Sequence, residues 1–239
     1  DEPFFAALSR KIEKREDRSI PTAGVRVCPE TAQFEMGYNP DFFASLPEEH
    51  VRGILKHEFY HLIFEHVTSR KPEGISPKLW NICADLAINS HLVGELPEWV
   101  CMPGEGSFQD LPKGESAEWY LAKLIEQGKT KKEAGDGEGE PGEGEPGDGE
   151  PDGGEPDGGE PGDGNGGSFD DHSGWAEDGD SAAQQAANQM AKERLKQSLK
   201  EAANEAAQSA KGWGSVSGAV KKEIIKRLET KVDWKKVLR

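Results

Sequence analysis

Residues 51–68, VRGILKHEFYHLIFEHVT, constrain this chain most, because they place ionisable groups inside an apolar helical run. His57 and His61 enclose Glu58 in the spacing H-E-x-x-H. Residues four apart on a helix share one face, so both imidazoles can reach one metal ion. Glu58 follows His57 by about 100° of rotation, which brings its carboxylate beside that ion as a general base. The pattern therefore predicts a zinc site that activates water.

The flanking residues predict where this helix begins and ends. Ser45 followed by Glu48 is a capping-box pattern, which predicts a start near Leu46 and an end near Ser69. Apolar residues surround the histidines, so the helix should be almost wholly buried. Two hydrogen-bonded core histidines are the alternative to a metal site. The acidic residue between them favours the metal, because a buried charge needs a partner.

Two nearby histidines do not fit as ligands of the same ion on a continuous helix. His66 is five positions after His61 and would point about 140° away from it. His50 precedes His57 by seven positions, which is roughly 10 Å along the helix axis. No glycine follows to break the helix, as the longer zinc signature requires. Both are expected to be structural, whereas Glu65, one turn beyond the second ligand, is a candidate to support it.

A second helix, predicted over residues 76–94, carries an internal line of polar side chains. Asn81, Asp85 and Asn89 recur every fourth position among apolar neighbours. A solvent-facing line would be rich in Lys and Glu, so these groups are expected to have buried partners. We predict Asp85 as the third ligand, since catalytic zinc sites keep three protein ligands and one open position. His91 is the alternative third ligand, and Asn89 or Asn81 would orient a histidine through its other ring nitrogen.

The strong negative charge of the chain is confined to one segment. The net charge is −16, but residues 133–171 hold fifteen acidic and no basic residues, which leaves −1 for the rest. This distribution does not indicate nucleic-acid binding. Three cysteines without C-x-x-C spacing predict reduced thiols and a cytoplasmic location. The sequence has no apolar span of about 20 residues and no signal-peptide pattern, so we expect no membrane association.

The acidic segment divides the chain into three predicted parts. Residues 1–127 should form the main domain, and residues 128–168, rich in Gly, Pro, Glu and Asp, cannot bury a core and are expected to be a flexible linker. Calcium binding by this repeat is the less favoured alternative, because the apolar position of calcium repeats is missing. Residues 169–239 are expected to be a helical segment that packs on the core or on a partner. Near the start of this part, His172 is a candidate for a fourth ligand, an oxyanion donor or a docking residue.

The N-terminal part is predicted to place a small hairpin before the metal helix. Residues 3–14 carry apolar side chains at helical spacing, which predicts a short helix. Residues 20–38 alternate around a Pro-Glu-Thr turn, which predicts two strands. A strand beside the metal helix would be placed to pair with a substrate backbone.

Six motifs in order resemble a known family. They are PTAG, YNPDFF, HEFYHLIFEH, LWNICADLAIN, GESAEWYLAKL and DDHSGW, and they resemble the bacterial and phage putative metallopeptidase domain that precedes a von Willebrand factor A-like domain. The resemblance implies zinc held by His57, His61 and Asp85, with Glu58 as the base. It implies a protein or peptide substrate and, by analogy, a MoxR-type AAA+ ATPase as partner. The D-x-S-x-S motif of the A-like domain is absent from this sequence.

These observations together predict an α+β fold: a helix-dominated, zincin-like metallopeptidase domain with a small N-terminal β-hairpin and a helical C-terminal appendage. The predicted activity is zinc-dependent hydrolysis of peptide bonds. The alternative is a non-catalytic scaffold or adaptor that is stabilised by its metal and works with an AAA+ ATPase.

Overall fold

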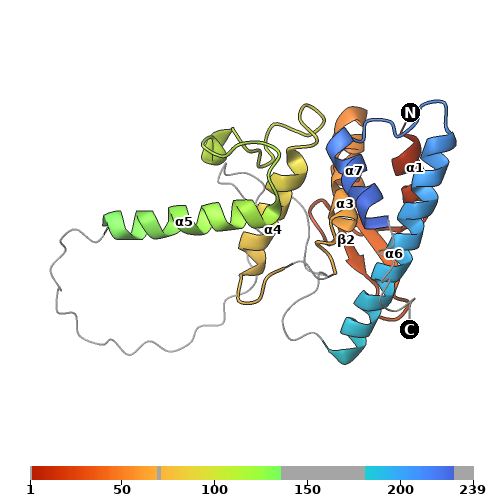
Figure 1. The fold of residues 1–239 in the computed structure, drawn as a ribbon, viewed down its shortest axis with the longest axis horizontal. Helices are drawn as coiled ribbons and strands as arrows, with labels where there is room; N and C mark the ends of the chain where they lie inside the picture. The colour runs from red at the N-terminus through yellow and green to blue at the C-terminus, as the bar shows by residue number, and fades with distance from the viewer. Residues whose placement is uncertain (1, 69–70, 136–180, 229–239) are drawn as a thin grey trace, which may run out of the picture.

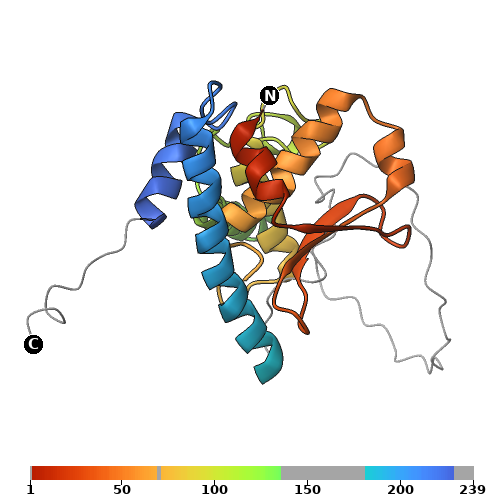
Figure 2. The same cartoon turned by 90° about the vertical axis from the view of Figure 1, so that its right-hand side faces the viewer.

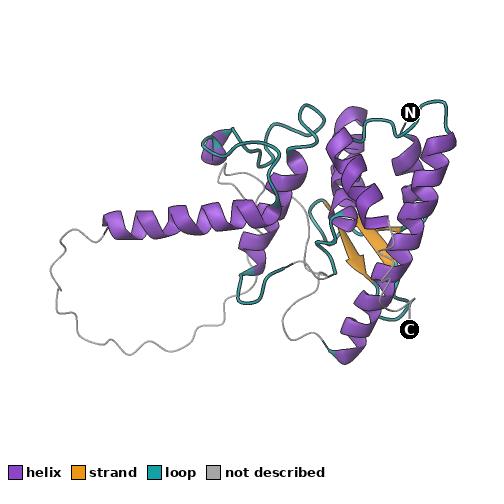
Figure 3. Ribbon diagram, in the orientation of Figure 1, coloured by secondary structure: helices purple, strands orange, loops and turns teal. Residues whose placement is uncertain are grey.

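The computed structural model describes residues 2–68, 71–135 and 181–228, and in this part of the chain seven helices accompany a three-stranded sheet. The fold is therefore α+β and rich in helices, as predicted (Figure 3). In chain order the elements are α1 (Pro3–Ser9), β1 (Glu13–Glu16), β2 (Ala23–Val27), β3 (Phe34–Tyr38), α2 (Pro40–Ala44), α3 (Glu48–Ile63), α4 (Pro77–Asn89), a 3₁₀ turn (Gly106–Phe108), α5 (Ala117–Gly135), α6 (Ala182–Gln208) and α7 (Gly218–Leu228). None of the helices in these ranges combines the length and the apolar character needed to cross a bilayer.

The hairpin predicted over residues 20–38 is present. β2 and β3 pair antiparallel, with Val25 opposite Met36. β1 pairs parallel with the other side of β3, so the strand order is β1-β3-β2. The helix predicted over residues 3–14 is wrong in its second half, because α1 ends at Ser9. The sequence of β1, EKRE, has no apolar alternation, and all four of its side chains are exposed. Pairing with β3 therefore makes this segment extended.

α3 is the element on which the two parts of the molecule pack. Figure 1 shows these two parts: the sheet with α1, α3, α6 and α7 at the right, and α4 with α5 at the left. α3 contacts α1, β2 and α6, and it also contacts α4. Figure 2 shows the long helix α6 running past α1, which it contacts. Two of the three residues predicted to bind metal, His57 and His61, therefore lie on this helix, and the third, Asp85, lies on α4, which contacts it.

The beginning of α3 differs from the prediction. The helix starts at Glu48 with Pro47 as its N-cap, and no side chain caps it. Ser45 instead follows α2, where its hydroxyl donates to the carbonyl of Phe42 at 2.7 Å. The predicted capping box was wrong because a separate short helix, α2, precedes α3. The side chain of Asn39 accepts from the amide of Asp41 and caps the start of α2, and Ser45 lies at the end of α2.

The other end of α3 closes in a Schellman turn. Glu65 has a φ of 61°, the left-handed conformation that glycine usually supplies. The amide of His66 then donates to the carbonyl of His61 at 3.0 Å, the six-to-one bond that defines this turn. The helix therefore ends at Ile63 rather than near Ser69.

α4 begins as predicted and ends earlier. The hydroxyl of Ser76 accepts from the amide of Leu79 at 3.3 Å, which caps the first turn. The helix stops at Asn89 rather than at Gly94, because the amide of Leu92 bonds the Asn89 carbonyl in a tighter three-residue turn.

α6 and α7, which follow the acidic segment, belong to the same apolar core as the N-terminal elements. Leu199 of α6 and Ile224 of α7 are buried in one cluster with Leu8 of α1. Arg194 of α6 also donates to the carbonyl of Ala32 at 3.0 Å, in the turn between β2 and β3. The sequence left the docking of this part open between core and partner, and in the described residues α6 and α7 pack on the core.

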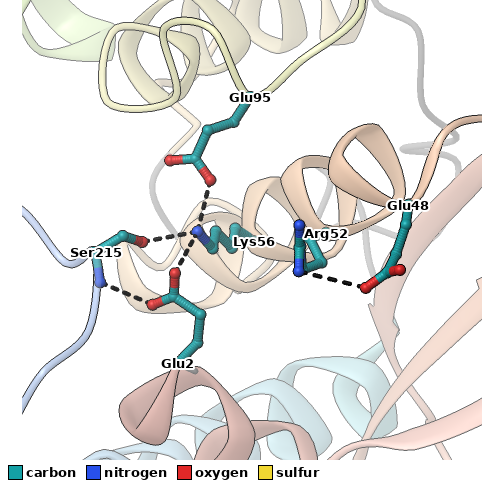
Figure 4. Close-up of polar contacts among 6 residues, drawn as sticks. All are labelled: Glu2, Glu48, Arg52, Lys56, Glu95 and Ser215. Atoms are coloured by element: carbon teal, nitrogen blue, oxygen red, sulfur yellow. Dashed lines mark hydrogen bonds and ion pairs between the residues drawn. The ribbon is translucent and has the colours of Figure 1, made fainter. Parts of the chain in front are cut away.

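A buried lysine attaches α3 to three distant segments (Figure 4). The ammonium of Lys56 donates to Glu2 at 2.8 Å, to Glu95 at 2.5 Å and to the hydroxyl of Ser215 at 2.7 Å. Glu2 also accepts from the amide of Ser215 at 2.7 Å. Only 7% of the Lys56 side chain is exposed. We call these four residues the Lys56 cluster; it joins the first residues, the metal helix, the chain after α4 and the α6–α7 connection.

Candidate metal centre

Three side chains of the kinds that bind metals meet where α3 and α4 contact each other. The ligand-type atoms of His57, His61 and Asp85 all lie within 4.8 Å of one another, and all three residues are fully buried. The two Nε2 atoms are 2.8 Å apart. Asp85 Oδ1 lies 3.6 Å from Nε2 of His57 and 3.4 Å from Nε2 of His61. Among the residues described, no other group of three His, Cys, Asp or Glu side chains converges in this way.

The distances fit a shared cation. Bonds of about 2.0–2.1 Å in tetrahedral geometry place two zinc ligands about 3.4 Å apart, close to the distances from Asp85 to each imidazole. The Nε2 atoms of the two imidazoles are closer to each other, at 2.8 Å. A fully buried carboxylate is costly unless it is paired or coordinates a metal, so this donor set is suited to an ion.

Asn89 fixes the orientation of the first histidine. Its Nδ2 donates to the carbonyl oxygen of Cys101 at 2.7 Å, which leaves Oδ1 facing Nδ1 of His57 at 2.8 Å. Because that oxygen only accepts, the hydrogen of the neutral ring lies on Nδ1. Nε2 of His57 therefore presents a lone pair towards Asp85 and His61. Asn81, the other residue considered for this role, is only half-buried.

His66 lies beside the second histidine, contrary to the prediction that it points away. Its Nδ1 is 3.1 Å from Nδ1 of His61, and the residue is 2% exposed. The prediction assumed a continuous helix, whereas the turn at Glu65 carries His66 back over the last helical turn. No local signal could have found this contact, because the residue in the left-handed conformation is not a glycine.

Glu58 occupies the helical position directly after His57 and is fully buried. In an H-E-x-x-H helix this is the position of the general base. The two histidines and Asp85 thus converge from two helices, and Glu58 is buried on α3 next to His57 in the sequence.

Other predicted candidates lie elsewhere. Glu65 does not support a ligand, because its side chain pairs with Lys192 of α6 at 3.2 Å. His91 is not in the converging group; it lines a cavity of about 310 Å³ between the ends of α3 and α4, the start of α5 and α7, and burial lowers its pKa. His172 lies outside the described residues.

The cysteines do not contribute to the converging group. All three are buried, and none of them forms a disulfide bond. Burial and, to a smaller extent, the nearby charge of Asp85 raise the pKa of Cys83 to about 12. The donor set is therefore two imidazole nitrogens and one carboxylate oxygen, without a thiolate.

Comparisons with curated proteins and with solved structures find no match to this chain. A family model described as a putative metallopeptidase domain matches residues 1–239. The family points at a coarse level to a metal-dependent protease, in agreement with a buried group that can hold a metal ion. Because the match covers the whole sequence, the chain belongs to the putative metallopeptidase domain family.

Proposed function

We propose that this protein is a zincin-like, zinc-dependent peptidase whose centre is His57, His61 and Asp85, with Glu58 as general base. The observation that carries the proposal is the convergence of two imidazole nitrogens and one carboxylate oxygen within 4.8 Å. Membership of a metallopeptidase family supports the same reaction class.

The donor set favours zinc. Two histidines and one carboxylate are an established ligand set of catalytic zinc sites, which keep a fourth position open. When bound, zinc acts as a Lewis acid that makes water nucleophilic near neutral pH and polarises a peptide carbonyl.

The side chains of the chain divide the remaining work. Glu58 takes the proton from the attacking water and delivers it to the leaving amine. Asn89 holds the ring of His57 through Nδ1, so that Nε2 stays directed at the centre. His172 remains a proposed oxyanion donor, since it lies outside the described residues.

The substrate is proposed to be an extended peptide or protein segment. β2 is an edge strand of the sheet and contacts α3, as required of a strand that pairs with a substrate backbone beside the metal helix. An AAA+ ATPase partner rests on the resemblance alone.

Glu58→Gln tests the proposal. The variant should lose cleavage of a fluorescently labelled unfolded protein, by at least the 10²–10⁴-fold typical of a removed general base. It should keep the metal, measured by elemental analysis of the purified protein. Cleavage at the wild-type rate by Glu58→Gln would show that the proposed base is wrong.

A second candidate function is a non-catalytic scaffold with a structural metal. The complete burial of His57, Glu58, His61 and Asp85 favours it, because structural sites are closed whereas catalytic sites admit substrate. Chelation separates the two functions. A structural site should lose fold stability on metal removal, whereas a catalytic site should lose cleavage while the protein stays folded.

A further inference from the structure

His66 connects the candidate metal centre with the neighbouring cavity. Its Nδ1 lies 3.1 Å from Nδ1 of His61, and its side chain lines the cavity of about 310 Å³ that His91 and Arg227 also line. His66 therefore borders both a proposed metal ligand and a space large enough for several water molecules.

The backbone is built to hold His66 in this place. The amides of Glu65 and His66 donate to the carbonyls of Leu62 and His61, both at 3.0 Å, which are the two bonds of a Schellman turn. Glu65 adopts the left-handed conformation although it has a Cβ atom. A non-glycine residue keeps this conformation only where the surroundings enforce it. The ring of His66 is also packed edge-on against Trp80, with centroids 5.8 Å apart.

The chemistry of His61 needs an acceptor at this position. A ring that offers its Nε2 lone pair to a cation carries its hydrogen on Nδ1. That hydrogen points at His66, whose own Nδ1 can accept it. Asn89 does the same for His57, so each of the two imidazoles has a partner of its own on its far nitrogen.

We propose that His66 is a positioning residue that accepts the Nδ1 hydrogen of His61 and so keeps Nε2 directed at the bound ion. The inference rests on the proposed metal centre. It assigns His66 to the site through His61, without contact with substrate or with the reacting water.

His91 offers a matched control. It lines the same cavity and packs on the same Phe64 ring, with centroids 6.0 Å apart against 5.8 Å for His66. It does not belong to the converging group. A loss caused only by disturbed packing at this cavity should therefore appear in both histidine variants.

The first experiment measures zinc affinity of the full chain by competition with a chromophoric chelator at neutral pH. His66→Phe keeps a ring but removes the acceptor, and zinc should bind about 10–100-fold more weakly. His66→Gln, which retains an acceptor oxygen, should recover part of this loss, and it also serves if His66→Phe does not fold. His91→Phe should bind zinc within about twofold of wild type, because His91 does not hold a metal ligand in place.

The second experiment uses rescue. His66→Ala joins the vacated space to the cavity, so millimolar imidazole can enter and accept from His61. Imidazole should then strengthen zinc binding to His66→Ala. In wild type and in His91→Ala, imidazole should leave zinc binding unchanged or weaken it. Wild-type protein that fails to bind zinc would overturn the metal centre itself. Tight zinc binding by His66→Phe and His66→Ala, or weak binding that neither imidazole nor His66→Gln restores, would overturn the role of His66 alone.

Discussion

Lys56 and His57 are consecutive residues of α3, and each belongs to a different cluster of buried polar side chains. The two clusters differ in the balance of hydrogen-bond donors and acceptors. In the Lys56 cluster, one ammonium donates three hydrogen bonds, two of them to carboxylates of opposite charge (Figure 4). At His57, two imidazole nitrogens and one carboxylate oxygen face a common position instead. The first arrangement is complete within the protein, whereas the second gathers lone pairs that a cation would satisfy.

The difference separates a structural polar cluster from a binding one. Burial alone does not distinguish the two clusters, because the exposed fraction of the whole residue is 5% for Lys56 and 0% for His57. The distinction lies in the balance between donors and acceptors. A cluster whose donors and acceptors match holds the fold together, and a cluster with converging acceptors is predicted to hold a ligand.

The largest expected effect is at the metal ligand Asp85. Asp85→Asn keeps the shape of the side chain and removes its charge, so zinc affinity should fall by more than about 100-fold, the upper end for an outer partner. The metal-free protein should be no less stable than wild type, since the variant no longer buries a carboxylate. Metal competition and urea unfolding after chelation measure the two quantities. A large loss of stability in the metal-free variant would mean that Asp85 is structural.

Lys56→Met should show the opposite pattern. Removing the ammonium leaves Glu2 and Glu95 facing each other, and the free energy of unfolding should fall by about 3 kcal/mol. We place it at the lower end for a broken buried pair because these carboxylates are 24% and 33% exposed. Zinc affinity of the folded variant should stay within about twofold of wild type, less than for any group that supports a ligand. An equal loss of metal affinity would mean that the two clusters are coupled.

Gly53→Ala tests the close approach of α3 to the chain that carries Glu95. A Cβ atom at Gly53 would lie 2.0 Å from the carbonyl oxygen of Glu95, so the two segments must separate. We expect a loss of about 1–3 kcal/mol, as for other overpacked sites. Gly128, which has nothing within 4 Å of the same added atom, provides the control substitution. Equal stability of the two alanine variants would contradict the close contact.

The smallest effect is on the acid side of the stability profile. Burial on its own raises the pKa of Glu2, but hydrogen bonds from Lys56 and Ser215 outweigh it, so the pKa lies below its usual value. A lowered folded-state pKa stabilises the protein above the unfolded value of about 4.3, and this contribution is lost as the pH falls through the folded value. Glu2→Gln should therefore be less stable than wild type near neutral pH, with the difference shrinking at acidic pH. A difference independent of pH would argue against the charge of Glu2.

Much of the site could be predicted because its signals are local. The four-residue spacing of His57 and His61, and the polar line that contains Asp85 and Asn89, follow from helix periodicity alone. The hairpin of β2 and β3 was likewise predicted from alternation over adjacent residues and is confirmed. The contact between His66 and His61 was not predictable, since a strained left-handed Glu65 creates it.

By itself, the sequence determined which helices carry the ligand-type side chains and which face each side chain takes, because a helix sets these by its period. Only the tertiary structure decided that α3 and α4 meet at those faces, that β1 is extended, and that Lys56 finds acceptors up to 159 residues away. These features depend on long-range packing and pairing, whose partners are distant in the chain and leave no periodic signal beside the residues concerned.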